Sequence, residues 1–308
     1  LSDVIEHLTN PLPLLAWLRS KLMANERNRL VLSSPDRRRQ GYPDPSASPP
    51  NDAHVREWSI DELITFVRVC GFKVNESLHT RSNEFDTSCS SSLLILSCTK
   101  AHYRAHLRNM GFPPESMEAT RFLVTAEYAP FHVTGGIGTF VMEQKLNFGK
   151  DAVVLLVKKD CTDAELKKAR RLEILPSPLL IPSSNTIHLP PEDLALRSVE
   201  QALFFMPQIK HVEYPDYQGL GVRIAQAKNV GLLAQSIKTI VQCHGMTHYL
   251  ENATQTWLGL SHNGFAEKEK RSVELSDFVV FPTHFLRFLY AVSGFEIPEE
   301  RVRLLRYP

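Results

Sequence analysis

The amino-acid sequence predicts an α/β protein with two successive domains, and three observations carry that prediction. The chain has 308 residues, which is enough for two hydrophobic cores of ordinary size. Short apolar strands alternate with amphipathic helices in both halves, as in sheets that are covered by helices. A glycine-rich stretch, Thr134–Gly138, separates a strand from a helix in the second half. We therefore expect one domain in residues 1–100 and another in residues 118–308.

The overall composition excludes several classes of protein. The 35 Lys and Arg residues balance 34 Asp and Glu residues, so the net charge of +1 calls for neither nucleic acid nor an anionic membrane. None of the five cysteines forms a C-x-x-C pair, which argues against a disulfide framework or a zinc site and favours a reducing cytoplasm. No apolar run reaches the roughly 20 residues that cross a bilayer, so we expect a cytoplasmic protein without an integral membrane span.

The first elements of the chain are a helix, a strand and a long loop. Asn10 and Pro11 form a helix start, with leucines following at helical spacing. Leu30–Leu32 reads as a short buried strand, and the Pro-, Ser- and Arg-rich residues 34–51 as a surface loop. The chain begins at Leu1 within a strand-like pattern and stops at Pro308, so we expect a piece of a longer protein.

A second helix and two strands complete the first domain. Ser59 and Glu62 form a capping box, and Gly71 ends the same helix as a C-cap. Lys73–Thr80 and Leu93–Cys98 then read as two strands with no helix between them. This order predicts an antiparallel edge on an α/β sheet.

Three short sequence motifs of the first domain resemble those of a known family. They are Ser-Asp-Val-Ile-Glu-His-Leu at Ser2–Leu8, Ser-Pro-Asp-Arg at Ser34–Arg37 and His-Val-Arg-Glu-Trp at His54–Trp58. Together with the element order, they resemble the carboxyl-terminal half of a class I S-adenosylmethionine-dependent methyltransferase. In that family the glycine-rich loop that holds the methyl donor lies upstream of anything present here. The resemblance therefore implies S-adenosylmethionine binding only if that upstream half is present.

Acidic and imidazole groups recur at helical spacing near the start of the chain. Asp3, Glu6 and His7 stand at i, i+3 and i+4, so one helical turn would present all three together. The resemblance implies a possible role, because some small-molecule and RNA methyltransferases place a divalent metal on a similar word. The alternative is that these are ordinary polar residues at a strand end beside the methyl-donor pocket. We predict no metal site on the sequence alone.

Residues 101–117 are expected to join the two domains as a linker. A basic, helix-like piece is followed by Gly111 and by the breaker pair Pro113–Pro114. Such breakers are typical of a domain boundary.

The second domain begins with a strand, a loop, a helix and another strand. Arg121–Thr125 is the first strand, a helix is expected from Thr139, and Ala152–Val157 is the second strand. A glycine-rich turn between strand and helix lets backbone N–H groups approach a phosphate. The same turn also allows close strand–helix packing, and the pattern alone leaves both interpretations open.

The second domain also resembles a known family, through several sequence motifs that occur in the expected order. Thr125–Phe131 leads into Thr134–Gly138, and the later words are Val212–Gly219, Ile240–Gly245, Ser276–Thr283 and Arg301–Pro308. These words resemble the amino-terminal, acceptor-side domain of GT-B glycosyltransferases, the glycogen/starch synthase-like and family 4-like group. The two resemblances together imply a partial class I methyltransferase sheet followed by a Rossmann-like GT-B amino-terminal domain.

The second resemblance also implies roles for single residues. It places the diphosphate of a nucleotide-sugar donor against Thr134, Gly135, Gly136 and Gly138. It places His244 near the donor sugar and Asp216 facing the acceptor pocket, as the catalytic residues. The alternatives are a strand-end histidine satisfied by backbone groups and a turn residue after Pro215.

Two departures from the family pattern bear on the donor corner. Val133 stands where the glycogen-synthase-like group has a lysine, and Thr139 stands where an acidic residue often follows the last glycine. Both changes remove charge from the phosphate corner. The second Rossmann-like domain, which supplies most nucleotide contacts in this group, is also missing from the sequence.

The resemblances predict an enzyme. The expected enzyme is a glycosyltransferase that transfers a sugar from a nucleotide-sugar to a hydroxyl of a glycan or other acceptor, fused to a methyltransferase remnant or half, and the resemblance implies retention at the sugar carbon. One alternative is a non-catalytic fragment or scaffold that lacks the donor-binding parts of both domains. Another is a nucleotide-dependent enzyme of different chemistry on a doubly wound fold.

Overall fold

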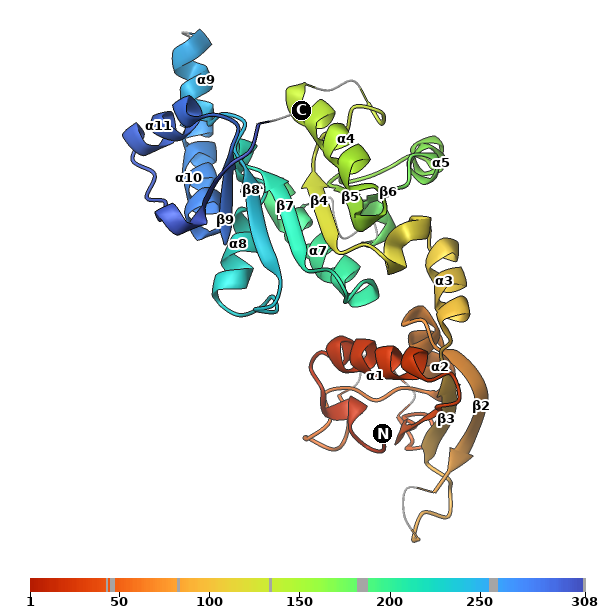
Figure 1. Ribbon diagram of the computed structural model, residues 1–308. Coiled ribbons are helices and arrows are strands. Elements are labelled where there is room, and N and C mark those ends of the chain that lie inside the picture. The colour runs from red at the N-terminus through yellow and green to blue at the C-terminus, as the bar shows by residue number, and fades with distance from the viewer. Residues whose placement is uncertain are drawn as a thin grey trace. The chain divides into compact units, whose positions relative to one another are not determined.

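The computed structural model describes residues 1–42, 44, 48–81, 84–132, 135–181, 188–254 and 260–306. The chain divides into two compact units, Leu1–Asn109 and Met110–Pro308. Figure 1 colours the first unit from red to gold and the second from yellow to blue. Each unit has its own sheet.

The first unit contains a three-stranded antiparallel sheet. Its strands are β1 (Leu30–Pro35), β2 (Lys73–Thr80) and β3 (Ser91–Ser97), in the order β1-β3-β2. Both pairings are antiparallel, as expected for the two closing strands. The start of the chain, whose sequence pattern is strand-like, does not form a strand. Its described backbone has only a bridge from Ser2 to Ser33 and the 3-10 helix η1 (Ile5–His7).

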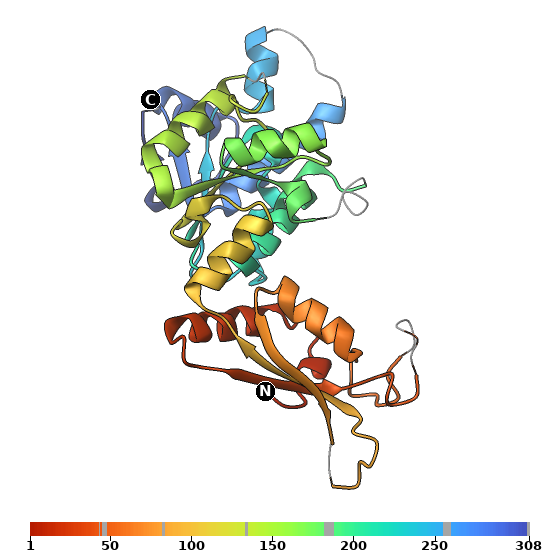
Figure 2. The ribbon, with the colours of Figure 1, turned by 90° about the vertical axis from the view of Figure 1, so that its right-hand side faces the viewer.

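Helices α1 (Leu12–Ala24) and α2 (Ile60–Val69) lie on one face of this sheet (Figure 2). The Asn10 side chain accepts a hydrogen bond from the Leu12 amide at the start of α1, at 3.1 Å. The predicted capping box at the start of α2 is present in both directions. Gly71 follows α2 with φ of +88°, a conformation that favours glycine. Both ends of α2 are therefore those that the sequence indicates, whereas α1 starts one residue later than expected, with Pro11 rather than Asn10 as its N-cap.

Regular structure occupies much of the expected linker at residues 101–117. Helix α3 (Lys100–Asn109) belongs to the first unit, and its Tyr103 and Leu107 are buried. The 3-10 helix η2 (Pro114–Met117) belongs to the second unit. The boundary between the units is thus the short turn after α3, because the two apolar side chains bind that helix to its own core.

The second unit is built on a seven-stranded parallel sheet, in the order β10-β9-β8-β7-β4-β5-β6. Every described strand pairing in it is parallel. The strands are β4 (Arg121–Thr125), β5 (Ala152–Leu156), β6 (Ile174–Pro176), β7 (His211–Pro215), β8 (Lys238–Gln242), β9 (Phe278–Phe281) and β10 (Val302–Leu304). A parallel sheet with connecting helices confirms the predicted α/β class and is consistent with a Rossmann-like fold.

Helices connect these strands. They are α4 (Gly136–Phe148), α5 (Asp163–Arg171), α7 (Pro191–Phe205), α8 (Val222–Asn229), α9 (Thr247–Thr254), α10 (Leu260–Leu275) and α11 (His284–Val292). Short 3-10 turns are η3 (Gly149–Asp151), η4 (Ser177–Leu179), η5 (Tyr217–Gly219) and η6 (Glu299–Arg301). Helices α7, α8 and α10 pack against one another, on the face of the sheet opposite α4 (Figure 1).

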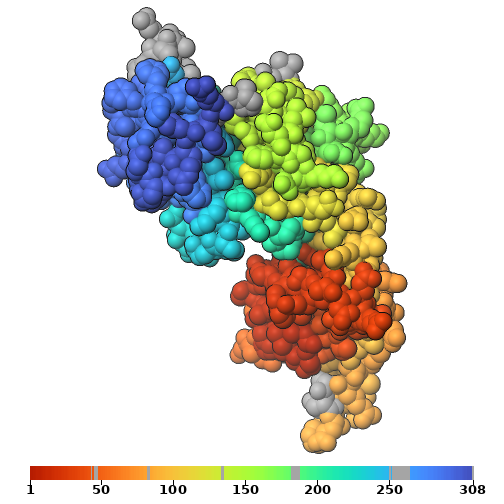
Figure 3. Space-filling view, in the orientation of Figure 1, coloured from red at the N-terminus to blue at the C-terminus, as the bar shows by residue number. Residues whose placement is uncertain are grey.

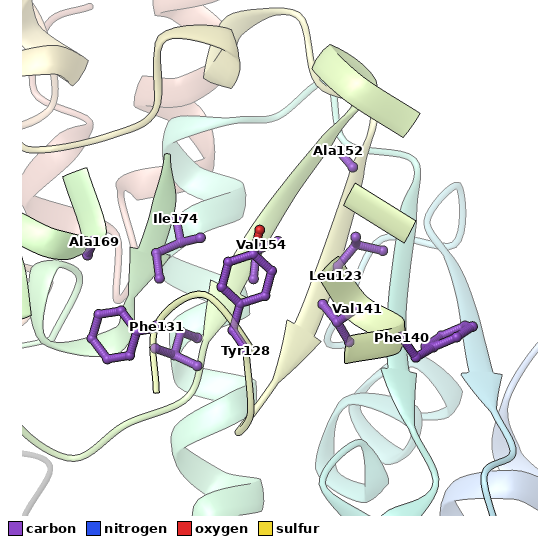
Figure 4. Packing of buried hydrophobic residues seen from close by; sticks show 10 residues of the cluster. Leu123, Tyr128, Phe131, Phe140, Val141, Ala152, Val154, Ala169 and Ile174 are labelled. Atoms are coloured by element: carbon purple, nitrogen blue, oxygen red, sulfur yellow. The ribbon is translucent and has the colours of Figure 1, made fainter. Parts of the chain in front are cut away.

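The core of the second unit surrounds β5, all of whose side chains are buried. Tyr128 and Phe131, from the loop after β4, pack into the same cluster as Phe140 and Val141 of α4 (Figure 4). Aromatic side chains bury much apolar area, so these two anchor the loop to the sheet. The path of the loop toward α4 is thereby determined by the core.

The last segments of the chain, from α10 to β10, lie together on one flank of the second unit (Figure 3). Val302–Leu304, within the motif at Arg301–Pro308, lies in the sheet parallel to β9. Its apolar Val302 and Leu304 allow it to extend the sheet as the edge strand. Among the described helices, none combines the length and the apolar character needed to span a bilayer.

Candidate functional site

The strand order of the second unit creates one position where loops diverge. Outward from β4 the chain runs through β5 and β6 on one side, and through β7, β8, β9 and β10 on the other. Ligands of open α/β sheets bind at such a switch point, outside the carboxyl ends of the strands. The loops that follow β4, β7 and β8 meet there, and they carry the residues that the sequence singled out.

The buried Thr125 side chain stabilises the turn at the start of the loop after β4. The Thr125 hydroxyl donates to the Glu127 carbonyl at 2.7 Å and accepts from the Glu127 amide at 3.0 Å. The Ala129 amide then donates to the Gly138 carbonyl at 3.2 Å, which ties the loop to α4. The Glu127 side chain consequently lies beside the glycines, with Oε2 3.8 Å from where a Gly135 Cβ would be.

The glycines form the first turn of α4. The helix starts at Gly136 with Gly135 as its N-cap, three residues before the start that the sequence predicts at Thr139. Gly135 and Gly136 are exposed and Gly138 is buried. A Cβ on Gly136 would meet nothing within 4 Å, so the space on the side-chain side of this residue is open. Thr134 and Val133 lie outside the described residues.

His244 follows β8 and reaches the same place. Its ring meets the Phe140 ring of α4 edge-on, with centroids 4.7 Å apart. Burial lowers the pKa of the imidazole below its usual value, although the carboxylates of Asp216 and Glu127 oppose that change. The ring is therefore neutral at pH 7. The structure thus brings His244 to the helix that begins with the glycines.

Asp216 is fully buried, although the resemblance implies that it faces an acceptor pocket. Its carboxylate accepts hydrogen bonds from the amides of His244 at 3.0 Å and Gly245 at 3.5 Å. It also accepts one from the Tyr290 hydroxyl of α11. These contacts connect the ends of β7 and β8 with α11. The Asp216 side chain therefore holds the start of the His244 loop.

A cavity of about 10 Å³ lies under this site, which is room for about one water molecule. Val124, Phe140, Pro215 and His244 are among its lining residues. The cavity is therefore too small for a nucleotide or a sugar. The sequence analysis did not identify Phe140 and Tyr290, because their contacts with His244 and Asp216 join residues far apart in the chain.

A second group of polar residues lies in the first unit. Glu6, His7 and His54 each offer one donor atom, and these atoms all lie within 4.8 Å of one another. The sequence pattern linked Glu6 and His7 with Asp3, whose carboxylate instead accepts from the Ser2 hydroxyl at 3.0 Å. His54 comes from the His-Val-Arg-Glu-Trp word, some fifty residues later. Only the fold brings it to the other two.

Comparison with known proteins does not assign the chain to a family. No protein-family model and no curated protein matches the chain.

Proposed function

We propose that Met110–Pro308 serves as the acceptor-side domain of a GT-B glycosyltransferase. The enzyme would transfer a sugar from a nucleotide-sugar donor to a hydroxyl of a glycan or other acceptor. One observation carries the proposal: at the switch point of a parallel sheet, His244 packs against Phe140 of α4, the helix whose first turn holds the glycines. Retention at the sugar carbon follows from the resemblance of the sequence words.

The proposed chemistry is positioning combined with charge stabilisation. The amides of the first turn of α4 and the positive end of its dipole would hold the diphosphate as negative charge develops on it. His244 would form a hydrogen bond with the donor sugar, because its neutral ring has one donor and one acceptor nitrogen. Asp216 would act as a positioning residue that holds His244 through its backbone amide.

For Leu1–Asn109 we propose a methyltransferase-like role, as a remnant or half of a class I enzyme. The antiparallel pairing of β2 and β3 at the end of an α/β order supports this. Binding of S-adenosylmethionine would need the upstream half. We also propose a reducing, cytoplasmic environment, because the described chain keeps its five cysteines as free thiols.

The second candidate is a non-catalytic scaffold, and Glu127 is the observation that favours it. A carboxylate beside Gly135 would repel the diphosphate of a donor. Weak donor binding without turnover would then be the outcome, and the experiment below separates the two candidates.

Isothermal titration calorimetry of the full chain with uridine, adenosine and guanosine diphosphates tests the proposal. We expect saturable binding of at least one of them and its loss in Gly136→Asp, which places a negative charge where a Cβ has open space. Gly264→Asp is the matched control, because Gly264 is an exposed glycine of α10 whose Cβ would also meet nothing within 4 Å. Absence of binding by all three diphosphates and by S-adenosylhomocysteine would favour the scaffold.

A further inference from the structure

Helix α11 is apolar on two opposite faces. Its inner face carries Leu286 and Tyr290, which are buried in the second unit. Its outer face carries Phe285, Phe288 and Val292, which are 63%, 60% and 62% exposed. A surface helix normally turns one apolar face to its core and polar residues to water. The core of the unit therefore does not explain the outer face, and we call these three residues the α11 stripe.

The edge strand β10 adds apolar surface on the same side of the sheet. Leu304 of β10 is exposed and stands in register with Phe281 of β9, so the two side chains point to the same face. The Phe281 ring meets the Tyr290 ring of α11 edge-on, with centroids 5.2 Å apart. Leu304 therefore lies on the face that α11 covers, at the free edge of the sheet (Figure 1).

The exposed apolar area has the size of an interaction surface. A phenylalanine offers about 150–250 Å², so the α11 stripe and Leu304 together expose on the order of 400 Å². A standard interface buries about 800 Å² on each partner, of which about 57% is apolar. The α11 stripe and Leu304 thus supply nearly the apolar part of one side of such an interface. Single exposed apolar residues are ordinary, but a cluster of this area marks a contact site.

The spacing of the α11 stripe indicates that its partner is a helix. The three residues stand at i, i+3 and i+7, which is the pattern of a seam between two helices. Such a seam runs along the helix axis and packs best against a second seam of the same kind. The chain itself provides one, because every copy carries the same α11.

The charges of α11 also favour a second copy. Arg287 is the one Lys, Arg, Asp or Glu residue of the helix, and Glu299 pairs with it. Leu289 and Ala291 flank the α11 stripe and bring no charge to it. Two copies of α11 can therefore meet without placing like charges in contact, which would oppose self-association.

A two-fold axis gives the two helices complementary shapes. Two-fold dimers are the commonest oligomers, and the same patch on both copies forms their interface. When two α11 helices lie antiparallel across such an axis, Phe285 of one copy faces Val292 of the other. A large side chain then meets a smaller one at both ends, and the two Phe288 rings meet near the axis.

We propose that α11 forms the interface of a two-fold symmetric dimer of this chain, in which the two helices pack antiparallel through the α11 stripe. The dimer uses the outer face of the helix. It does not rest on the sugar transfer proposed for the second unit.

Sedimentation equilibrium of the full chain from about 1 to 100 μM tests the dimer. We expect the mass to rise with concentration from 34.9 kDa toward twice that value. Phe288→Asp should weaken association by about thirtyfold or more, because loss of a central aromatic anchor has an effect of that size. Leu232→Asp is the matched control and should change it by less than about twofold, since Leu232 is an equally exposed apolar residue in the turn after α8.

A pair of charged variants tests the antiparallel arrangement. Phe285→Lys and Val292→Glu should each weaken the dimer when measured alone. Mixed in equal amounts, they should associate more tightly than either alone, because the new ammonium of one copy faces the new carboxylate of the other. Dimers formed through another surface would show no such gain.

Circular dichroism checks that the variants fold, and their exposed positions favour this. The proposal is overturned if the full chain stays monomeric over the whole concentration range, or if folded Phe288→Asp dimerises as tightly as the wild type. It is equally overturned if the mixed charged variants gain nothing over the separate ones. A monomer that binds anionic phospholipid vesicles, and loses that binding in Phe288→Asp, would assign the α11 stripe to a membrane surface instead.

Discussion

Burial and nearby charges determine the protonation state of His244 in the second unit. His244 is kept neutral by burial, and the nearby carboxylates of Asp216 and Glu127 only partly offset that effect. Of these two carboxylates, Asp216 has its oxygens bonded to amides and a hydroxyl. Glu127 is half-buried beside Gly135, where it influences both the ring and the proposed diphosphate position.

Removing the Glu127 charge should therefore strengthen diphosphate binding. We expect Glu127→Gln to raise the affinity for the bound nucleoside diphosphate by about fivefold, or about 1 kcal/mol, because a like charge is removed from the phosphate corner. The pKa of His244 should fall further in the same variant. Calorimetry and NMR titration measure the two effects. Glu143→Gln, on the same helix as the glycines, is the control, and equal effects of the two substitutions would contradict the assigned role.

The raised pKa of Glu269 in α10 should make the stability of the second unit depend on pH. Burial raises its pKa from 4.5 to about 7, although Thr247 and the Gln218 amide donate hydrogen bonds to it. Between these pKa values the folded state holds a proton that the unfolded state has lost, so stability falls as pH rises. The loss should be on the order of 2–3 kcal/mol between pH 5 and pH 8.

Thermal unfolding at several pH values tests this dependence. In Glu269→Gln the part of the slope that Glu269 causes should disappear, because the amide does not titrate. Glu267→Gln is the control on the same helix, since the Glu267 side chain is 63% exposed. A wild-type slope that persists unchanged in Glu269→Gln would rule out this carboxyl as its source.

At the scale of elements, local signals in the sequence predicted both ends of α2. Ser59 and Glu62 form the expected capping box, and Gly71 follows the helix with a positive φ. The start of α4 was expected three residues too late, because glycine is a poor helix former and Gly136 and Gly138 were therefore assigned to the loop. In the structure the anchors Tyr128 and Phe131 determine where the chain enters the helix, and no local pattern contains that contact.

Tyr290 of α11 contributes to the site although it lies far from Asp216 in the sequence. Its buried hydroxyl donates to Asp216, whereas the buried Tyr214 hydroxyl pairs with the neutral Ser276 hydroxyl at 2.9 Å. Hydrogen bonds to charged groups contribute more than neutral ones. We expect Tyr290→Phe to lower the free energy of unfolding by about 2 kcal/mol and Tyr214→Phe by about 1 kcal/mol.

Chemical denaturation of the two variants measures this difference. Tyr290→Phe should also shift the backbone amide resonance of His244, because the shared Asp216 carboxylate loses one donor. Equal destabilisation by both substitutions, with an unmoved His244 resonance, would show that Asp216 does not depend on α11.

At the scale of the whole molecule, composition and alternation were sufficient for the α/β class but not for the arrangement of strands. The strands β4 and β5 and the helix between them could be read in order along the sequence. The return of the chain to place β7 beside β4 could not, because strand order depends on long-range pairing such as that of Phe122 with Val212. The same limit applies to Glu6 and His54, which local spacing cannot join.

The two-unit division predicts that Met110–Pro308 folds alone. Its parallel sheet, connecting helices and core all lie within that range. Expressed separately, it should unfold cooperatively and keep any nucleotide affinity of the full chain within about twofold, as expected for an independent domain. Denaturation and calorimetry on the separate unit check this. A non-cooperative transition would show that its core needs residues of the first unit.

The most direct test of the donor site follows both of its sides in one NMR titration. In the isotopically labelled full chain, nucleoside diphosphate sugars should shift the amide resonances of Gly135 and Gly136 together with the imidazole resonances of His244. The proposed function predicts that both sets move with one dissociation constant, and that Gly136→Asp abolishes both changes. Glycine resonances that move without His244, or no movement of either set, would contradict a donor site at the switch point.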